Sequence, residues 1–210
     1  IEKNKVMNLT AITEPEEFAL KHFADSISLL TAVEEASVLS SKEVSLIDVG
    51  TGAGFPAIPI KIVCPDLKLT LLDSLNKRIT FLNEVITALN LNGITTVHAR
   101  AEEGGRNSNL RDSFDFVVSR AVASLNTLSE YCLPYTKVGG LFISYKSGDI
   151  SEELKSSQNA ITKLGGKLID VKSFQLADSD ISRSFVIIRK EKPRPKAYPR
   201  KPGTAKRSPL

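Results

Sequence analysis

The chain has 210 residues, of which 41% are hydrophobic and 25% charged, and its formal net charge is +4. This composition is ordinary for one globular domain, and no run of 18 apolar residues predicts a membrane span. Two well-separated cysteines and two histidines argue against a zinc site, so we expect no metal. With no signal peptide visible, we expect a cytoplasmic protein with reduced thiols and no membrane partner.

The chain opens with a predicted amphipathic helix. Residues 15–36 place apolar side chains on one side, and Pro15 followed by two glutamates marks its start. We assign residues 1–40 to an N-terminal helical segment, and because the sequence begins at Ile1 rather than Met we expect this segment to be truncated.

A buried strand then runs into a glycine-rich turn. The predicted strand 45–50 is apolar apart from Asp48, and glycines follow it at every second position. Such glycines allow a sharp turn and let a ligand approach the main chain. The next predicted strand, 67–73, ends on Asp73, where a carboxylate can accept hydrogen bonds from ribose hydroxyls. Together the turn and the carboxylate predict a nucleoside cofactor, although a tight turn without a ligand is the simpler alternative.

What the turn lacks identifies the cofactor. No Gly-Lys-Ser/Thr triplet is present, which excludes a phosphate-binding P-loop. A dinucleotide fingerprint requires a third glycine where Phe55 stands, and Pro56 follows it. The wider turn fits S-adenosylmethionine, which has no pyrophosphate. The predicted contacts from the first two strand ends are Gly50, Thr51, Gly52, Gly54, Phe55, Asp73 and Ser74.

Strands alternate with helices through the second predicted domain, residues 41–190. Further strands are expected at 94–99, 114–119, 139–146, 167–175 and 183–190, and helices at 57–64, 76–91, 124–135 and 150–164, with a short helix after Ala101. Alternation predicts a parallel α/β sheet with helices on both faces. The last two strands are joined by a short polar link and form an antiparallel hairpin. A seven-stranded, mostly parallel sheet ending in such a hairpin is the Rossmann-like fold of class I S-adenosylmethionine-dependent methyltransferases.

Polar residues at the other strand ends complete the predicted pocket. After the third strand, Glu102 can accept a hydrogen bond from an adenine amino group. Arg120 follows the fourth strand, and its guanidinium cannot act as a base but can hold an anion or stack on a nucleobase. No cysteine or Asn-Pro-Pro-Tyr cluster is present for other methylation chemistries. This pattern favours an acceptor with a free lone pair, such as guanine N7, with Arg120 as the catalytic residue.

The predicted tail, residues 191–210, is basic and proline-rich. From Arg189 onward nine Lys or Arg residues accompany one acid, and five of the ten prolines lie here. Proline at this density predicts an extended, solvated segment, and extended cations suit an RNA backbone. Tyr198 favours RNA because an aromatic ring can stack on an unpaired base. The alternative is a terminus that serves only solubility.

Seven motifs occur in order along the chain: Asn8–Thr13, His22–Ser26, Asp48–Pro56, Asp73–Leu82, Arg100–Glu102, Ser119–Ala123 and Tyr198–Thr204. Together they closely resemble the bacterial small-subunit ribosomal RNA guanine-N7 methyltransferases, once called glucose-inhibited division protein B. The resemblance covers nearly the whole chain. It departs in lacking the usual helical segment before Asn8 and in reading Tyr-Lys-Ser at the end of the fifth strand, where Leu-Lys-Gly is commoner.

The resemblance implies methyl transfer from S-adenosylmethionine to N7 of one guanine in 16S ribosomal RNA. The partner would be this RNA in the small ribosomal subunit or in an assembly intermediate, and we expect the protein to be a monomer. Implied cofactor contacts are Gly50, Phe55, Ala101, Glu102 and Arg120. Expected RNA-binding residues are His22, Lys77, Arg78, Lys146, Arg200 and Lys201, with Asp25 a further candidate beside His22.

Two other functions stay open. The chain could be an RNA-binding protein whose methyltransferase fold has lost catalysis, or an NAD-dependent oxidoreductase.

Overall fold

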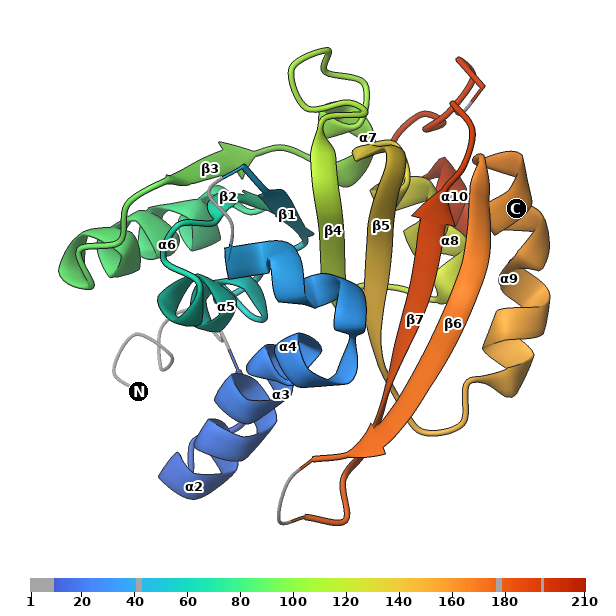
Figure 1. The fold of residues 1–210 in the computed structure, drawn as a ribbon. Helices are drawn as coiled ribbons and strands as arrows, with labels where there is room; N and C mark the ends of the chain where they lie inside the picture. The colour runs from blue at the N-terminus through green and yellow to red at the C-terminus, as the bar shows by residue number, and fades with distance from the viewer. Residues whose placement is uncertain (1–9, 41–42, 177–178, 194) are drawn as a thin grey trace.

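A computed structural model describes residues 10–40, 43–176, 179–193 and 195–210. Within them, seven strands form one sheet in the order β3-β2-β1-β4-β5-β7-β6 (Figure 1). The strands are β1 (Ser45–Val49), β2 (Lys68–Asp73), β3 (Ile94–His98), β4 (Phe114–Arg120), β5 (Thr136–Ser147), β6 (Gly166–Gln175) and β7 (Ser182–Lys190). The first five are parallel, and β7 pairs antiparallel with both β5 and β6. The predicted fold, hairpin included, is confirmed.

Helices follow the strands as the alternation predicts. They are α5 (Ala57–Val63), α6 (Asn76–Ala88), the short α7 (Ala101–Gly104), α8 (Leu125–Cys132) and α9 (Ser151–Lys163). Two of them, α6 and α8, end three residues earlier than expected. Asn90 adopts a positive φ of 50° just beyond α6, a conformation that terminates a helix, and Pro134 cannot continue α8.

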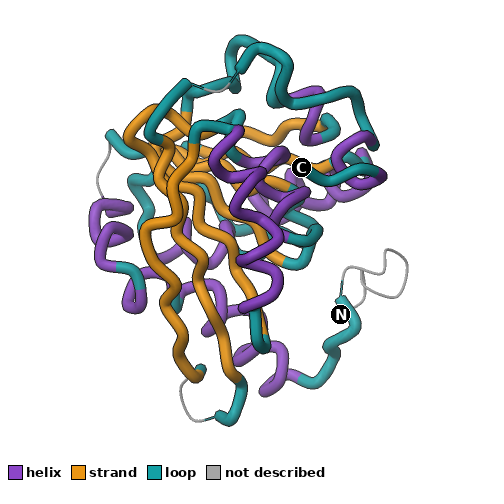
Figure 2. The backbone as a smooth tube through the Cα atoms, turned by 90° about the vertical axis from the view of Figure 1, so that its right-hand side faces the viewer, coloured by secondary structure: helices purple, strands orange, loops and turns teal. Residues whose placement is uncertain are grey.

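Neighbouring residues on each buried strand point to opposite faces of the sheet, and each face carries its own core. Leu46, Ile143 and Ile187 face a cluster that includes α5 and α6. Ile47 and Phe142 face the other cluster, which includes α8 and α9. Figure 2 shows the strands lying between these layers. In the part of the chain that is described, no helix combines the length and apolar character that crossing a bilayer requires.

The N-terminal helix differs from the prediction over 15–36. It comprises α2 (Pro15–Phe18), the π-helical turn η1 (Ala19–Ala24), α3 (Asp25–Ile27) and α4 (Leu29–Ala32). Val33 is extended, and a 3₁₀ helix, η2 (Glu34–Ser40), follows it. Tyr145 on β5 donates a hydrogen bond of 2.8 Å to the carbonyl of Ser26 and ties this segment to the sheet. The start of the first motif, Asn8 and Leu9, and the expected boundary at residue 41 lie outside the described residues.

The prediction of an extended, solvated tail is wrong for the part that packs on the domain. Pro199 and Ala205 are buried, and α10 (Thr204–Arg207) closes the chain beside α8. Arg106 donates two hydrogen bonds to the carbonyl of Pro199. The guanidinium and backbone N–H of Arg200 bind the carboxylate of Glu130, which is 1% exposed. Glu130, a buried acid on α8, binds this part of the tail, and the composition of the tail alone cannot reveal this contact.

Arg200 and Lys201 therefore differ in their expected effect on stability. Arg200→Ala leaves the Glu130 carboxylate buried without its counter-charge and should lower the free energy of unfolding by about 3 kcal/mol in urea denaturation. Lys201→Ala removes a neighbouring exposed charge and should leave it unchanged. Equal stabilities for the two variants would mean that the Arg200–Glu130 pair does not anchor the tail.

Candidate functional site

Two adjoining cavities lie at the carboxyl edge of the parallel strands. The larger cavity, of about 500 Å³, lies between the glycine turn and the N-terminal helical segment. The smaller cavity, of about 350 Å³, lies between the ends of β2 and β3 and the tail. Gly50, Arg78 and Ala121 line both, so the two form one continuous site at the place where strand order reverses.

The glycine turn is shaped for close approach to the main chain. Gly50 and Gly52 have positive φ angles of 79° and 61°, which L side chains rarely adopt. A Cβ on Gly50 would lie 2.7 Å from Cγ2 of Val122, whereas the space beyond Gly52 is open. Phe55 and Thr51 also line the larger cavity. A ligand can therefore lie against the backbone at Gly52.

Asp73 joins the turn to the second strand. Its carboxylate, 2% exposed, accepts hydrogen bonds from the N–H groups of Gly52 at 3.0 Å and Leu75 at 2.9 Å, and from Arg78 at 3.2 Å. A carboxylate has about four acceptor sites, so Asp73 retains capacity for one more donor on the side of the smaller cavity. The residue predicted to bind ribose thus also fixes the turn.

Beneath the turn lies a carboxyl group with no hydrogen-bond partner among the described residues. Asp48 is fully buried, and neither of its oxygens is paired; the buried hydroxyl of Thr51 is likewise unpaired. Burial raises the pKa of Asp48 to about 7, while the nearby Thr51 hydroxyl and the Arg120 charge partly oppose this rise. When ionised, Asp48 places a negative potential under the site that favours a cationic ligand.

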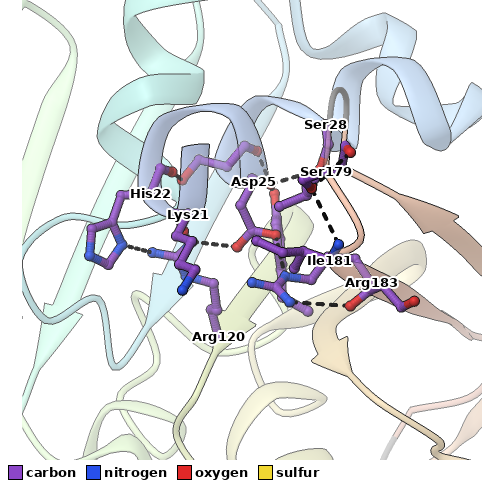
Figure 3. Close-up of polar contacts among 12 residues, drawn as sticks. Lys21, His22, Asp25, Ser28, Arg120, Ser179, Ile181 and Arg183 are labelled. Carbon is purple, nitrogen blue, oxygen red and sulfur yellow. Dashed lines mark hydrogen bonds and ion pairs between the residues drawn. The ribbon is translucent and has the colours of Figure 1, made fainter. Parts of the chain in front are cut away.

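Arg120 contacts the N-terminal helical segment directly, in the wall of the larger cavity (Figure 3). Its guanidinium donates to Asp25 at 2.6 Å, to the carbonyl of Lys21 at 3.2 Å and to Nδ1 of His22 at 3.1 Å. Asp25, 2% exposed, also accepts a 2.8 Å hydrogen bond from Nε of Arg183 on β7. One buried carboxylate therefore holds two arginines from different strands.

His22 is held neutral by the same contacts. Burial and the charge of Arg120 lower its pKa, and Asp25 offsets part of this effect. Because Arg120 donates to Nδ1, the ring proton lies on Nε2, which faces the Thr10 hydroxyl at 2.7 Å. The ring stacks on Phe55, with centroids 4.7 Å apart and planes 13° apart. His22 and Phe55 form one aromatic wall of the cavity.

The smaller cavity brings together the predicted residues Ser74, Ala101 and Glu102. The Glu102 carboxylate, 4% exposed, accepts a 2.7 Å hydrogen bond from the N–H of Gly203 in the tail. Lys206 from α10 lines the same cavity. The tail is therefore part of the wall, which the predicted solvated tail did not anticipate.

Four predicted residues line neither cavity. Gly54 faces the core, since a Cβ there would lie 2.6 Å from Ile58. Lys77 and Lys201 are exposed, and Arg200 is paired with Glu130. By contrast, His22, Arg78, Arg120 and Lys146 line the larger cavity.

Arg183 is a lining residue that sequence reasoning missed. It is the second residue of β7 and pairs in register with Ser147 at the end of β5. Because β7 is antiparallel to β5, its first residues lie at the carboxyl edge of the parallel strands. The predicted hairpin therefore contained the signal that places Arg183 at the site.

Known proteins resemble this chain in both sequence and fold. A model of the family described as GidB, rRNA small subunit methyltransferase G, matches residues 1–183. Two relatives are each 53% identical to this chain. They are the proteins named ribosomal RNA small subunit methyltransferase G from Alkaliphilus metalliredigens and Acetivibrio thermocellus. These matches cover all of this chain and 86% and 84% of the relatives.

Among solved structures, a SAM dependent methyltransferase from Aquifex aeolicus superposes with a TM-score of 0.60. It is 14% identical, and the match covers 86% of this chain and 96% of that one. At this identity the likeness concerns the fold alone.

The buried Asp48 predicts a specific pH dependence of stability. The pKa of Asp48 in the folded protein, about 7, lies above its unfolded value of 3.8. The contribution of Asp48 to the free energy of unfolding is therefore fully present below the unfolded pKa and is lost as pH rises through 7. Asp48→Asn removes this loss. Its unfolding free energy relative to wild type should rise by about 4 kcal/mol between pH 3 and pH 8 in denaturation series. Parallel curves for variant and wild type would contradict a buried, unpaired carboxylate.

Proposed function

The chain belongs to the rRNA small subunit methyltransferase G family, and on that premise we propose that it transfers a methyl group from S-adenosylmethionine to N7 of one guanine in 16S ribosomal RNA. The observation that carries the proposal is the open backbone at Gly52, tied to the Asp73 carboxylate at the tip of the neighbouring strand. The exposed backbone can hold the amino-acid end of the cofactor, and the carboxylate beside it can accept a hydrogen bond from the ribose.

The residues present fit this cofactor. The turn leaves room for an amino-acid chain over Gly52, and the remaining acceptor site of Asp73 suits a ribose hydroxyl. The smaller cavity, with Glu102 in its wall, suits adenine. When ionised, Asp48 adds negative potential beneath the turn, which suits the positive sulfonium and ammonium groups. The bound cofactor supplies an activated methyl group.

Guanine N7 needs no proton removed before attack, and the residues around the larger cavity match that requirement. S-adenosylmethionine held at Gly52 and Asp73 would supply the methyl group, and the lone pair of N7 would accept it without the loss of a proton. Arg120 stays protonated and cannot accept a proton. His22 has its Nδ1 occupied by Arg120. Neither residue is required to act as a general base, and catalysis rests on alignment.

In this proposal Arg120 orients the acceptor and the aromatic wall excludes water. The guanidinium lines the larger cavity, fixed by Asp25, Lys21 and His22, and can donate to an oxygen of the entering base. The Cζ atom of Arg120 lies 5.6 Å from the centre of the Phe55 ring, so the guanidinium and the ring form one surface. This gives Arg120 contact with the reacting nucleotide and the role of catalytic residue.

The partner and setting follow from the same function. We propose that the substrate is 16S RNA in the small ribosomal subunit or an assembly intermediate, and that the protein works in the cytoplasm. A monomer suffices, because residues of one chain line both cavities.

The reaction is tested by mapping N7-methylguanine in 16S RNA from cells that lack the protein. One modified position should be missing, and purified protein with S-adenosylmethionine should restore it on small subunits from those cells. An unchanged methylation pattern would refute the proposed reaction. Tight binding of NADH with no binding of S-adenosylmethionine would favour an oxidoreductase instead.

Cofactor binding is tested through Asp73. Asp73→Ala removes the ribose acceptor and the partner of the Gly52 N–H, and should weaken S-adenosylhomocysteine by about 2 kcal/mol in calorimetry. Glu152→Ala, at an exposed carboxylate on α9 that lines neither cavity, is the control and should bind as wild type does. If Asp73→Ala also binds as tightly as wild type, Asp73 does not belong to the cofactor site.

A further inference from the structure

Cations dominate the larger cavity. Five basic side chains of the described residues line it, and Asp25 is the single acidic side chain among them. The basic residues are Lys21, Arg78, Arg120, Lys146 and Arg183. Three of the five have a carboxylate of their own, because Lys21 pairs with Glu17, Arg78 with Asp73 and Lys146 with Glu153. The two remaining arginines share Asp25. Among the residues that the structure describes, one positive charge around this carboxylate is therefore left uncompensated.

The same two arginines keep donors free. Arg183 uses Nε for Asp25 and Nη1 for the carbonyl of Ser182, and its Nη2 has no acceptor within the described residues. Arg120 uses both terminal nitrogens, while its Nε has no acceptor in that same part of the chain. Both side chains are partly exposed, at 14% for Arg120 and 19% for Arg183. An entering anion can therefore reach donors that the described residues leave without an acceptor.

The fork of Arg183 is held in place before any ligand arrives. Asp25 is buried in the N-terminal helical segment and fixes Nε of Arg183 at 2.8 Å (Figure 3). A guanidinium fixed in this way loses little side-chain freedom on binding a phosphate, whose oxygens match its planar donors. Arg183 lines the larger cavity and is not one of the proposed cofactor contacts, so its free donor is available for a second ligand.

We propose that Arg183, with Arg120 held beside it by Asp25, binds a backbone phosphate of the RNA at the nucleotide whose base enters the cavity. The inference rests on the proposed function, which supplies an RNA substrate. A base that enters the cavity brings its own phosphodiester close to the cavity wall. There the phosphodiester lies beside the two positively charged arginines and accepts a hydrogen bond from Nη2 of Arg183.

The test measures binding of unmethylated small ribosomal subunits across a salt series. Arg183→Gln should weaken binding about tenfold at moderate salt. It should also reduce the slope of log affinity against log salt by about 0.7 to 0.9, the value for one phosphate contact. Affinity for S-adenosylhomocysteine should stay as in wild type. Lys155→Gln removes an exposed cation on α9 outside the cavity, and its slope should match wild type.

A second variant separates charge from structure. Arg183→Lys keeps the positive charge but not the planar fork, so it should retain the wild-type slope with an affinity between those of wild type and Arg183→Gln. Weaker binding by Arg183→Gln with an unchanged slope would overturn the inference and leave Arg183 a purely structural role beside Asp25. Unchanged affinity would overturn it as well. If wild-type protein fails to methylate the subunits, the proposed function fails instead.

Discussion

A hydrogen bond between the tips of two strands is the constraint on which the site depends. The N–H of Gly52 donates to the Asp73 carboxylate at 3.0 Å, and the same carboxylate accepts from Leu75 and Arg78. This contact joins the end of β1 to the end of β2 and holds the turn open beyond Gly52. Without it, neither the backbone cradle nor the acceptor beside it would have a fixed position.

Two segments distant in sequence complete the enclosure by burying a carboxylate each. The N-terminal helical segment brings Asp25 to Arg120 and Arg183 at the larger cavity, and Glu130 on α8 captures Arg200 so that the tail closes the smaller one. Each carboxylate is nearly fully buried. Buried ion pairs contribute little net stability against apolar alternatives, but they penalise any other arrangement of the charged partners. Here they position walls around a site that binds charged ligands.

Local features of the site could be predicted from sequence, and long-range ones could not. The turn at Gly50 and the carboxylate at Asp73 lie at strand ends, where periodicity and residue type suffice, and the hairpin follows from a link too short for a helix. The tail was mispredicted because proline and charge content describe the isolated segment, whereas Glu130 is buried in a distant helix. The π-helical turn η1, which precedes Asp25, leaves no apolar pattern of its own. Arg183 was missed although the antiparallel strand implied its place.

The central claim is that the strand tips at Gly52 and Asp73 bind the cofactor. A crystal structure of the protein with S-adenosylhomocysteine tests it most directly. The account predicts the ribose within hydrogen-bond distance of Asp73, the amino-acid end over Gly52 and the sulfur facing the cavity that contains Arg120. A ligand bound elsewhere, or in these cavities with its sulfur turned away from Arg120, would contradict it.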